Sequence, residues 1–154
     1  MIEFVFKPRK LASAVAYMAW KKPELAKTQL CKLLFFADKQ HLLTFGRTIT
    51  GDRYYALEQG PAPAHELDAT WGEGAAPDLK PLSKSDLDVL DETLRLHGNL
   101  PAWKLEELAF CEPAWMGTRL NTPIDFELFF SGHPEADLVK SIVEDEHAAL
   151  IPKG

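Results

Sequence analysis

The feature that most constrains this chain is residues 28–46, which are apolar around almost the whole circumference when drawn as a helix. The apolar residues of this segment lie on every side of the helix: Leu30, Cys31, Leu33, Leu34, Phe35, Phe36, Ala37, Leu42, Leu43 and Phe45. A surface helix carries one apolar stripe, so this pattern predicts a central helix that is buried on most sides. Thr28 suits the N-cap position and Gly46 suits the C-terminal cap.

The polar residues of this helix lie mostly toward its C-terminal end. Among them, Asp38 carries a charge that is unfavourable at this end of a helix. Unpaired carbonyl groups at a helix C-terminus stabilise positive side chains such as Lys39 and His41, but they repel a carboxylate. We therefore expect Asp38 to have a partner elsewhere in the chain.

The residues after this helix change to a pattern typical of strands. Residues 48–50 and 53–57 are short runs rich in β-branched and aromatic residues, separated by Gly51-Asp52. Gly followed by Asp suits a type II′ turn, so we predict a small β-hairpin that turns at these two residues. Residues 59–63 contain two prolines, which we expect to stiffen the exit from the hairpin.

The remaining chain is predicted to be mainly helical. Apolar residues at helical spacing indicate helices over residues 8–22, 64–71, 85–97, 101–109 and 135–150. Ser85 and Asp88 resemble a capping box, and Gly98 is expected to end that helix. We predict a mainly α fold, in which residues 1–154 form one compact helical domain around a buried central helix with a small β-hairpin.

Composition narrows the classes of function. The formal net charge is −6, which disfavours contact with phosphate backbones. The helix pair over residues 84–111 resembles a helix-turn-helix unit, but it holds more acidic than basic residues and argues against a nucleic-acid partner.

The chain has no apolar run long enough to span a membrane and begins without a signal-peptide pattern. Cys31 and Cys111 are far apart in sequence, which is typical of reduced cysteines, so we expect a cytoplasmic protein.

Few residues carry a pattern typical of catalysis or of metal binding. Asp38 and His41 share one helix face, and His65-Glu66 follows the predicted hairpin, so these four side chains could hold a metal ion in a metal-dependent hydrolase. The alternative is a histidine at a helix end that is hydrogen-bonded to a carboxylate or to the backbone. The sequence contains no phosphate-binding loop. We predict no catalytic residues, no cofactor and no enzymatic activity.

The segment from residue 28 to residue 63 is similar to a known family signature. The similarity is carried by Lys32-Leu33-Leu34-Phe35-Phe36-Ala37-Asp38, His41-Leu42, Gly46, Ile49-Thr50-Gly51-Asp52, Tyr54, Ala56 and Gly60-Pro61-Ala62-Pro63. These residues resemble the Panacea domain of the SocA-like antitoxins. Pro113-Ala114-Trp115 extends the resemblance more loosely. The resemblance implies an antitoxin that binds and neutralises a protein toxin encoded by an adjacent gene, either by direct inhibition or by delivery to a protease.

The predicted hairpin is the candidate surface for such a partner. Adjacent strand residues point to opposite faces, so one of Tyr54 and Tyr55 is expected to face outward beside Arg53. Aromatic and arginine side chains are enriched in the centres of protein interfaces. The candidate partner-binding residues are Asp38, His41, Asp52, Arg53, Tyr54 and Tyr55. In the alternative, Asp38, His41 and Asp52 only hold the hairpin on the helix, and the partner binds elsewhere.

Overall fold

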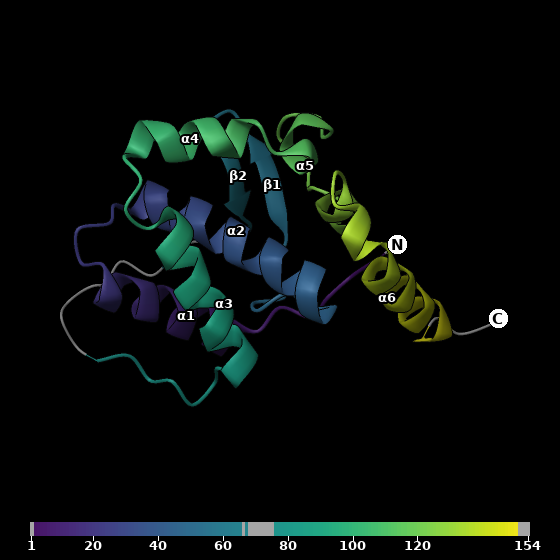
Figure 1. Cartoon of the computed structure of the whole chain (residues 1–154), viewed down its shortest axis with the longest axis horizontal. Helices are drawn as coiled ribbons and strands as arrows, with labels where there is room; N and C mark the ends of the chain where they lie inside the picture. The colour runs from purple at the N-terminus through teal and green to yellow at the C-terminus, as the bar shows by residue number, and fades with distance from the viewer. Residues whose placement is uncertain (1, 66, 68–75, 151–154) are drawn as a thin grey trace.

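The computed structural model of this chain describes residues 2–65, 67 and 76–150, and they form a mainly helical fold around one central helix. That helix is α2 (Lys27–Phe45), which contacts α1 (Pro8–Lys21) and α3 (Lys84–His97). In Figure 1, α2 crosses the middle of the molecule, with α1 and α3 beneath it and the β-hairpin above it. The predicted fold class, mainly α with a small hairpin, is confirmed.

Helix α2 is buried on most sides, as its apolar circumference predicts. Gly46 has the left-handed conformation (φ 83°) and its amide donates to the Leu42 carbonyl, which confirms the predicted C-terminal cap. The predicted N-cap was wrong, because the helix begins earlier and Ala26 takes that position. The Gln29 side chain accepts the Ala26 amide at 2.9 Å, which is the bond that the third helical residue supplies in a capping box.

The β-hairpin lies further along the chain than predicted. Strand β1 (Tyr54–Leu57) pairs antiparallel with β2 (Gly60–Pro63), and the turn is formed by Glu58-Gln59 rather than Gly51-Asp52. Residues 48–53 form a loop that is packed between α2 and the N-terminal segment. The prolines expected to stiffen the exit therefore lie in the second strand, where Tyr54 pairs with Pro63 and Ala56 with Pro61.

The free edge of β1 is covered by the segment over residues 121–124. The amides of Asn121 and Ile124 donate to carbonyls of Ala56 and Tyr54, both at 2.7 Å, and the Ala56 amide donates to Thr122 at 3.0 Å. Pairing of this edge leaves no run of free backbone donors along β1.

The other elements follow the predicted helices with shifted ends. The elements after α3 are α4 (Ala102–Phe110), α5 (Pro113–Met116), the 3₁₀ turns η1 (Phe126–Phe130) and η2 (Pro134–Ala136), and α6 (Asp137–Leu150). The capping box of α3 uses Ser83 and Asp86, two residues before the predicted pair. Most of the helix predicted over residues 64–71 lies outside the described residues.

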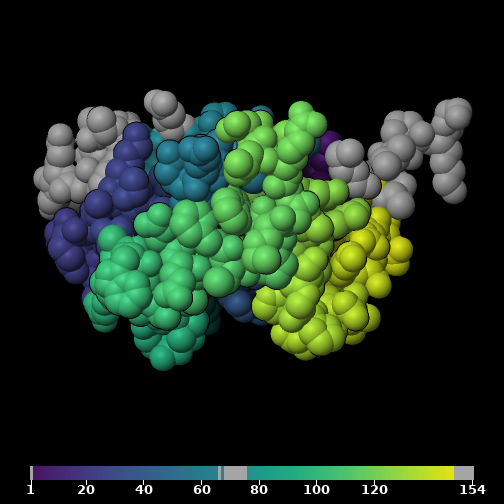
Figure 2. Space-filling view, turned by 90° about the horizontal axis from the view of Figure 1, so that it is seen from above, coloured from purple at the N-terminus to yellow at the C-terminus, as the bar shows by residue number. Residues whose placement is uncertain are grey.

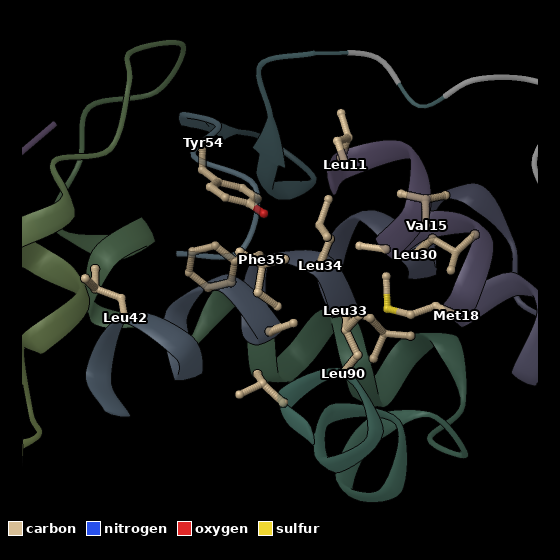
Figure 3. Packing of buried hydrophobic residues seen from close by; sticks show 14 of the residues in the cluster. Leu11, Val15, Met18, Leu30, Leu33, Leu34, Phe35, Leu42, Tyr54 and Leu90 are labelled. Atoms are coloured by element: carbon tan, nitrogen blue, oxygen red, sulfur yellow. The ribbon is translucent and has the colours of Figure 1, made fainter. Parts of the chain in front are cut away.

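One apolar core joins α1, α2, α3 and the hairpin. Figure 3 shows Leu33 of α2 beside Met18 of α1 and Leu90 of α3, and Phe35 next to Tyr54 of β1. Leu34 points to the opposite side of α2, toward Leu11 of α1. The Phe35 and Tyr54 rings meet edge to face, with centroids 5.4 Å apart. Within the described residues, no helix combines the length and the apolar character needed to cross a membrane.

Candidate functional site

Four of the six predicted partner-binding residues lie inside the protein. Asp38, His41, Asp52 and Tyr54 have at most 1% of their surface exposed. Arg53 is exposed and Tyr55 is half-buried. Because a buried side chain cannot contact a partner without an opening of the fold, the positions of these four correct the predicted surface. In the alternative, Asp38, His41 and Asp52 only hold the hairpin on the helix. Asp38 does bond Tyr54 of β1, whereas His41 bonds Arg47 and Ser85, and Asp52 bonds Arg53 and His65.

Asp38 holds the loop over residues 48–53 on α2 through four hydrogen bonds. Its carboxylate accepts from the amides of Ile49 (2.7 Å) and Thr50 (3.1 Å), from the Thr50 hydroxyl (2.7 Å) and from the Tyr54 hydroxyl (2.6 Å). Burial raises the pKa of Asp38 above its usual value, and these donors act in the opposite direction. The partner expected for Asp38 from its unfavourable helix position is therefore this loop together with β1.

Asp52, at the other end of the same loop, also accepts hydrogen bonds that fix the chain around it. Its carboxylate accepts the amides of Arg53 (2.9 Å) and His65 (3.0 Å), and it lies 2.8 Å from Nδ1 of the His65 ring. The His65 ring stacks on Phe6 with centroids 3.7 Å apart and planes inclined by 6°. Asp52 thus ties the hairpin to the chain that follows it and, through His65, to the N-terminal segment.

His41 is held between the loop and the first turn of α3. Its Nδ1 lies 2.6 Å from the Arg47 carbonyl, which can only accept, so Nδ1 carries the proton and Nε2 accepts from the Ser85 hydroxyl at 2.9 Å. Burial lowers the pKa of His41 below its usual value. Asp86 also lies at Nε2, at 3.2 Å. In a Ser-His-Asp triad the carboxylate binds Nδ1 instead, so this trio does not have the geometry of a hydrolase.

Asp86 is the third buried carboxylate, and the sequence reading did not single it out. It pairs with Lys10 at 2.7 Å and with Arg47 at 3.0 Å, and it accepts the Ser83 amide at 2.9 Å. Burial alone would raise the pKa of Asp86, but the hydrogen bonds from Lys10 and Ser83 and the charge of Arg47 together lower it. The capping-box pattern was the available signal, and it was assigned two residues too late.

The three described side chains of the alternative metal site, Asp38, His41 and His65, do not gather in one place. Asp38 and His41 belong to separate hydrogen-bond networks, His65 lies against Asp52, and Glu66 falls outside the described residues. In the described part of the chain, no group of three or more His, Cys, Asp or Glu side chains is placed to hold a metal ion.

The two cysteines are free thiols in different surroundings. Cys31 is half-buried in α2, and burial raises the pKa of its thiol, which lowers the fraction of reactive thiolate. Cys111 is exposed just after α4.

The structure also exposes large apolar side chains on α4 and α5. Trp103 of α4 is 67% exposed and Met116 at the end of α5 is 66% exposed. Trp115 is half-buried, and its ring lies 5.0 Å from that of Phe110. Trp71 falls outside the described residues. Figure 2 shows that α4, α5 and the segment that follows them lie together on one face, next to the tip of the hairpin. The available signal was the position of Trp103 in the first turn of a short helix, next to Lys104.

Comparison with known protein families identifies one match. The family model described as antitoxin SocA-like, Panacea domain, matches residues 30–116, more than half of the 154-residue chain. The matched region runs from α2 through the hairpin, α3 and α4 to α5. It contains the segment whose resemblance was recognised from sequence, so that resemblance is confirmed. Comparisons with curated proteins and with solved structures found no match.

Proposed function

Because this chain belongs to the antitoxin SocA-like family with the Panacea domain, we propose that it neutralises a protein toxin by binding it directly. The observation that carries this proposal is the family match over residues 30–116. The toxin is encoded by an adjacent gene, and the complex forms in the cytoplasm. The antitoxin acts as a single domain, without catalysis and without a cofactor.

The arrangement of the matched region supports a binding role. Asp38 and His41 of α2 bond the loop that precedes the hairpin, and Asp52 bonds the chain that follows it, so these side chains support a preformed surface. A partner that binds a preformed surface loses less conformational entropy than one that must order it. Among the residues predicted from sequence to bind the partner, Arg53 and Tyr55 remain candidates for direct contact.

The first prediction tests the function in cells. Expression of the protein encoded by the adjacent gene should stop growth, and co-expression of this chain should restore it. The purified pair should form a complex of fixed stoichiometry by size-exclusion chromatography with light scattering. A harmless neighbouring protein, or a toxic one that neither binds this chain nor is neutralised by it, would refute the proposal.

The level of the toxin in the same cells distinguishes direct inhibition from delivery to a protease. Direct inhibition leaves the toxin at an unchanged or higher level in rescued cells, because the complex protects it. Delivery to a protease lowers the toxin level, and rescue then fails in cells that lack the protease. Immunoblots of the toxin during a translation block distinguish the two mechanisms.

A further inference from the structure

The face formed by α4, α5 and the segment after α5 has the composition of a protein interface. We define the α4–α5 face by Trp103, Glu106, Phe110, Trp115, Met116 and Leu120. Trp103 is 67%, Met116 66% and Leu120 45% exposed, and the ring pair of Phe110 and Trp115 lies beside them. Aromatic residues and methionine are enriched in interface cores, and tryptophan is among the commonest hot-spot residues.

This face is fixed to the rest of the fold. The Trp115 indole N–H donates to the Leu57 carbonyl at 2.8 Å, and the Asn121 amide donates to the Ala56 carbonyl at 2.7 Å, so α5 and the segment after it are both bonded to β1. Glu112, between α4 and α5, forms a largely buried ion pair with Lys39 of α2 at 2.5 Å. A face held in this way requires little ordering when a partner binds.

The charges on this face are predominantly negative. Glu58 at the hairpin tip and Glu106 on α4 are exposed, and neither forms an ion pair within the described residues. The cation Lys104 is already paired with Glu107 at 3.3 Å, and Arg119 is the other basic residue here. Since the whole chain also carries a net charge of −6, a basic partner is attracted to this face from a distance.

Three other large apolar residues inside the family match are exposed, and they come from separate parts of the chain: Phe45 at the end of α2, Leu79 before α3 and Leu96 on α3. Trp20 lies on α1, before the matched region, and Leu138 and Ile142 lie on α6, after it. Trp103, Phe110 and Met116 all lie inside residues 30–116. A surface used for the shared function of a family is expected in the part of the chain that the family shares.

We propose that the cognate toxin docks on the α4–α5 face through a basic segment whose apolar side chains cover Trp103 and Met116. This inference rests on the proposed antitoxin function and assigns its main contact surface. Trp103 is the anchor, and Glu58 and Glu106 attract the basic side chains of the toxin.

The second prediction tests the anchor with the purified toxin encoded by the adjacent gene. Trp103→Ala should weaken binding at least about 10-fold, as hot-spot truncations do, with an unchanged melting temperature. The control is Trp20→Ala, because Trp20 is also partly exposed (46%) but lies on α1. Arg53→Ala and Tyr55→Ala, measured in the same assay, report on the hairpin contacts.

Charge reversal tests whether the toxin segment that binds the α4–α5 face is basic. Glu106→Lys should weaken binding more than Glu24→Lys, which makes the same change in net charge at an exposed residue between α1 and α2. The affinity of the wild-type complex should fall with added salt. Wild-type affinity of Trp103→Ala, together with equal effects of the two reversals, would overturn the inference and leave the antitoxin function standing. Failure of the wild-type chain to bind the toxin would overturn both.

Discussion

Three buried aspartates are used in different ways at the scale of single residues. Asp38 is stabilised by neutral donors from the loop and from Tyr54, whereas Asp86 is stabilised by two cations, Lys10 and Arg47. Removing a partner from a buried charge is far more costly than losing a surface pair, because the remaining group cannot return to water. Asp52 is bonded mainly to backbone amides that flank the hairpin. These carboxylates therefore specify where the loop and the hairpin lie.

Gly51 shows how tightly that loop is packed. Its φ is +73°, and a Cβ atom added there would lie 2.0 Å from the Val5 carbonyl oxygen. The third prediction is that Gly51→Ala lowers the free energy of unfolding by about 3 kcal/mol or more, since it combines backbone strain with a clash against main chain. Urea denaturation followed by circular dichroism measures the loss.

The matched control for Gly51 is Gly132, which also has a positive φ of +80° but has no atom within 4 Å of an added Cβ. Gly132→Ala should cost only the backbone strain, about 1–2 kcal/mol. Equal costs at the two glycines would mean that Val5 moves away freely and that the N-terminal segment does not hold the loop.

The candidate site was partly predictable from single residues. The unfavourable position of Asp38 near a helix C-terminus indicated a partner, and alternation along β1 indicated that one of Tyr54 and Tyr55 is buried. Sequence could not decide whether a polar side chain next to a loop faces water or caps that loop. The same residue types serve both purposes, and burial of Asp38, His41 and Asp52 depends on packing between distant segments.

At the scale of elements, the helices and the existence of a hairpin were predictable, but the position of the hairpin was not. The apolar circumference of α2 indicates burial whatever surrounds it, and Gly46 marks its end. Residues 48–50 have high β propensity but are bonded to Asp38, while Gly60–Pro63 has low propensity and forms β2. Strand propensity depends strongly on context, and β2 is a strand because it packs on α2 and pairs with β1.

The fourth prediction concerns the burial of α2. Leu34 is fully buried and faces the core shared with α1 and β2, so Leu34→Ala should lower the free energy of unfolding by about 2–5 kcal/mol. Leu96→Ala, at a residue of α3 that is largely exposed, should change it by less than about 0.5 kcal/mol. A change at Leu34 as small as that at Leu96 would show that α2 is not the centre of the core.

At the scale of the whole molecule, the buried His41 and the half-buried His97 make stability depend on pH. His41 lies against Arg47, Asp86, Lys10 and Ser85. Burial lowers the pKa of His41 and also that of His97, and the Nδ1 atom of His97 has no hydrogen-bond partner within the described residues. A histidine with a lowered folded-state pKa contributes stability that is present above its ordinary pKa of about 6.5 and is lost as the pH falls through the folded-state value.

The fifth prediction is that the free energy of unfolding falls between pH 7.5 and pH 5.5, because the unfolded chain binds protons at His41 and His97 before the folded chain does. His41→Gln should be less stable than wild type at pH 7.5, since its bond to Arg47 is lost, but it should lose less stability on acidification.

Burial raises the pKa of Asp38, so Asp38 changes the free energy of unfolding with pH in the opposite direction. The comparison of each variant with wild type cancels this contribution. Urea denaturation at both pH values provides the measurement for wild type, for each single variant and for the His41→Gln, His97→Gln double variant. A wild-type slope that persists in the double variant would place the titrating groups elsewhere in the chain.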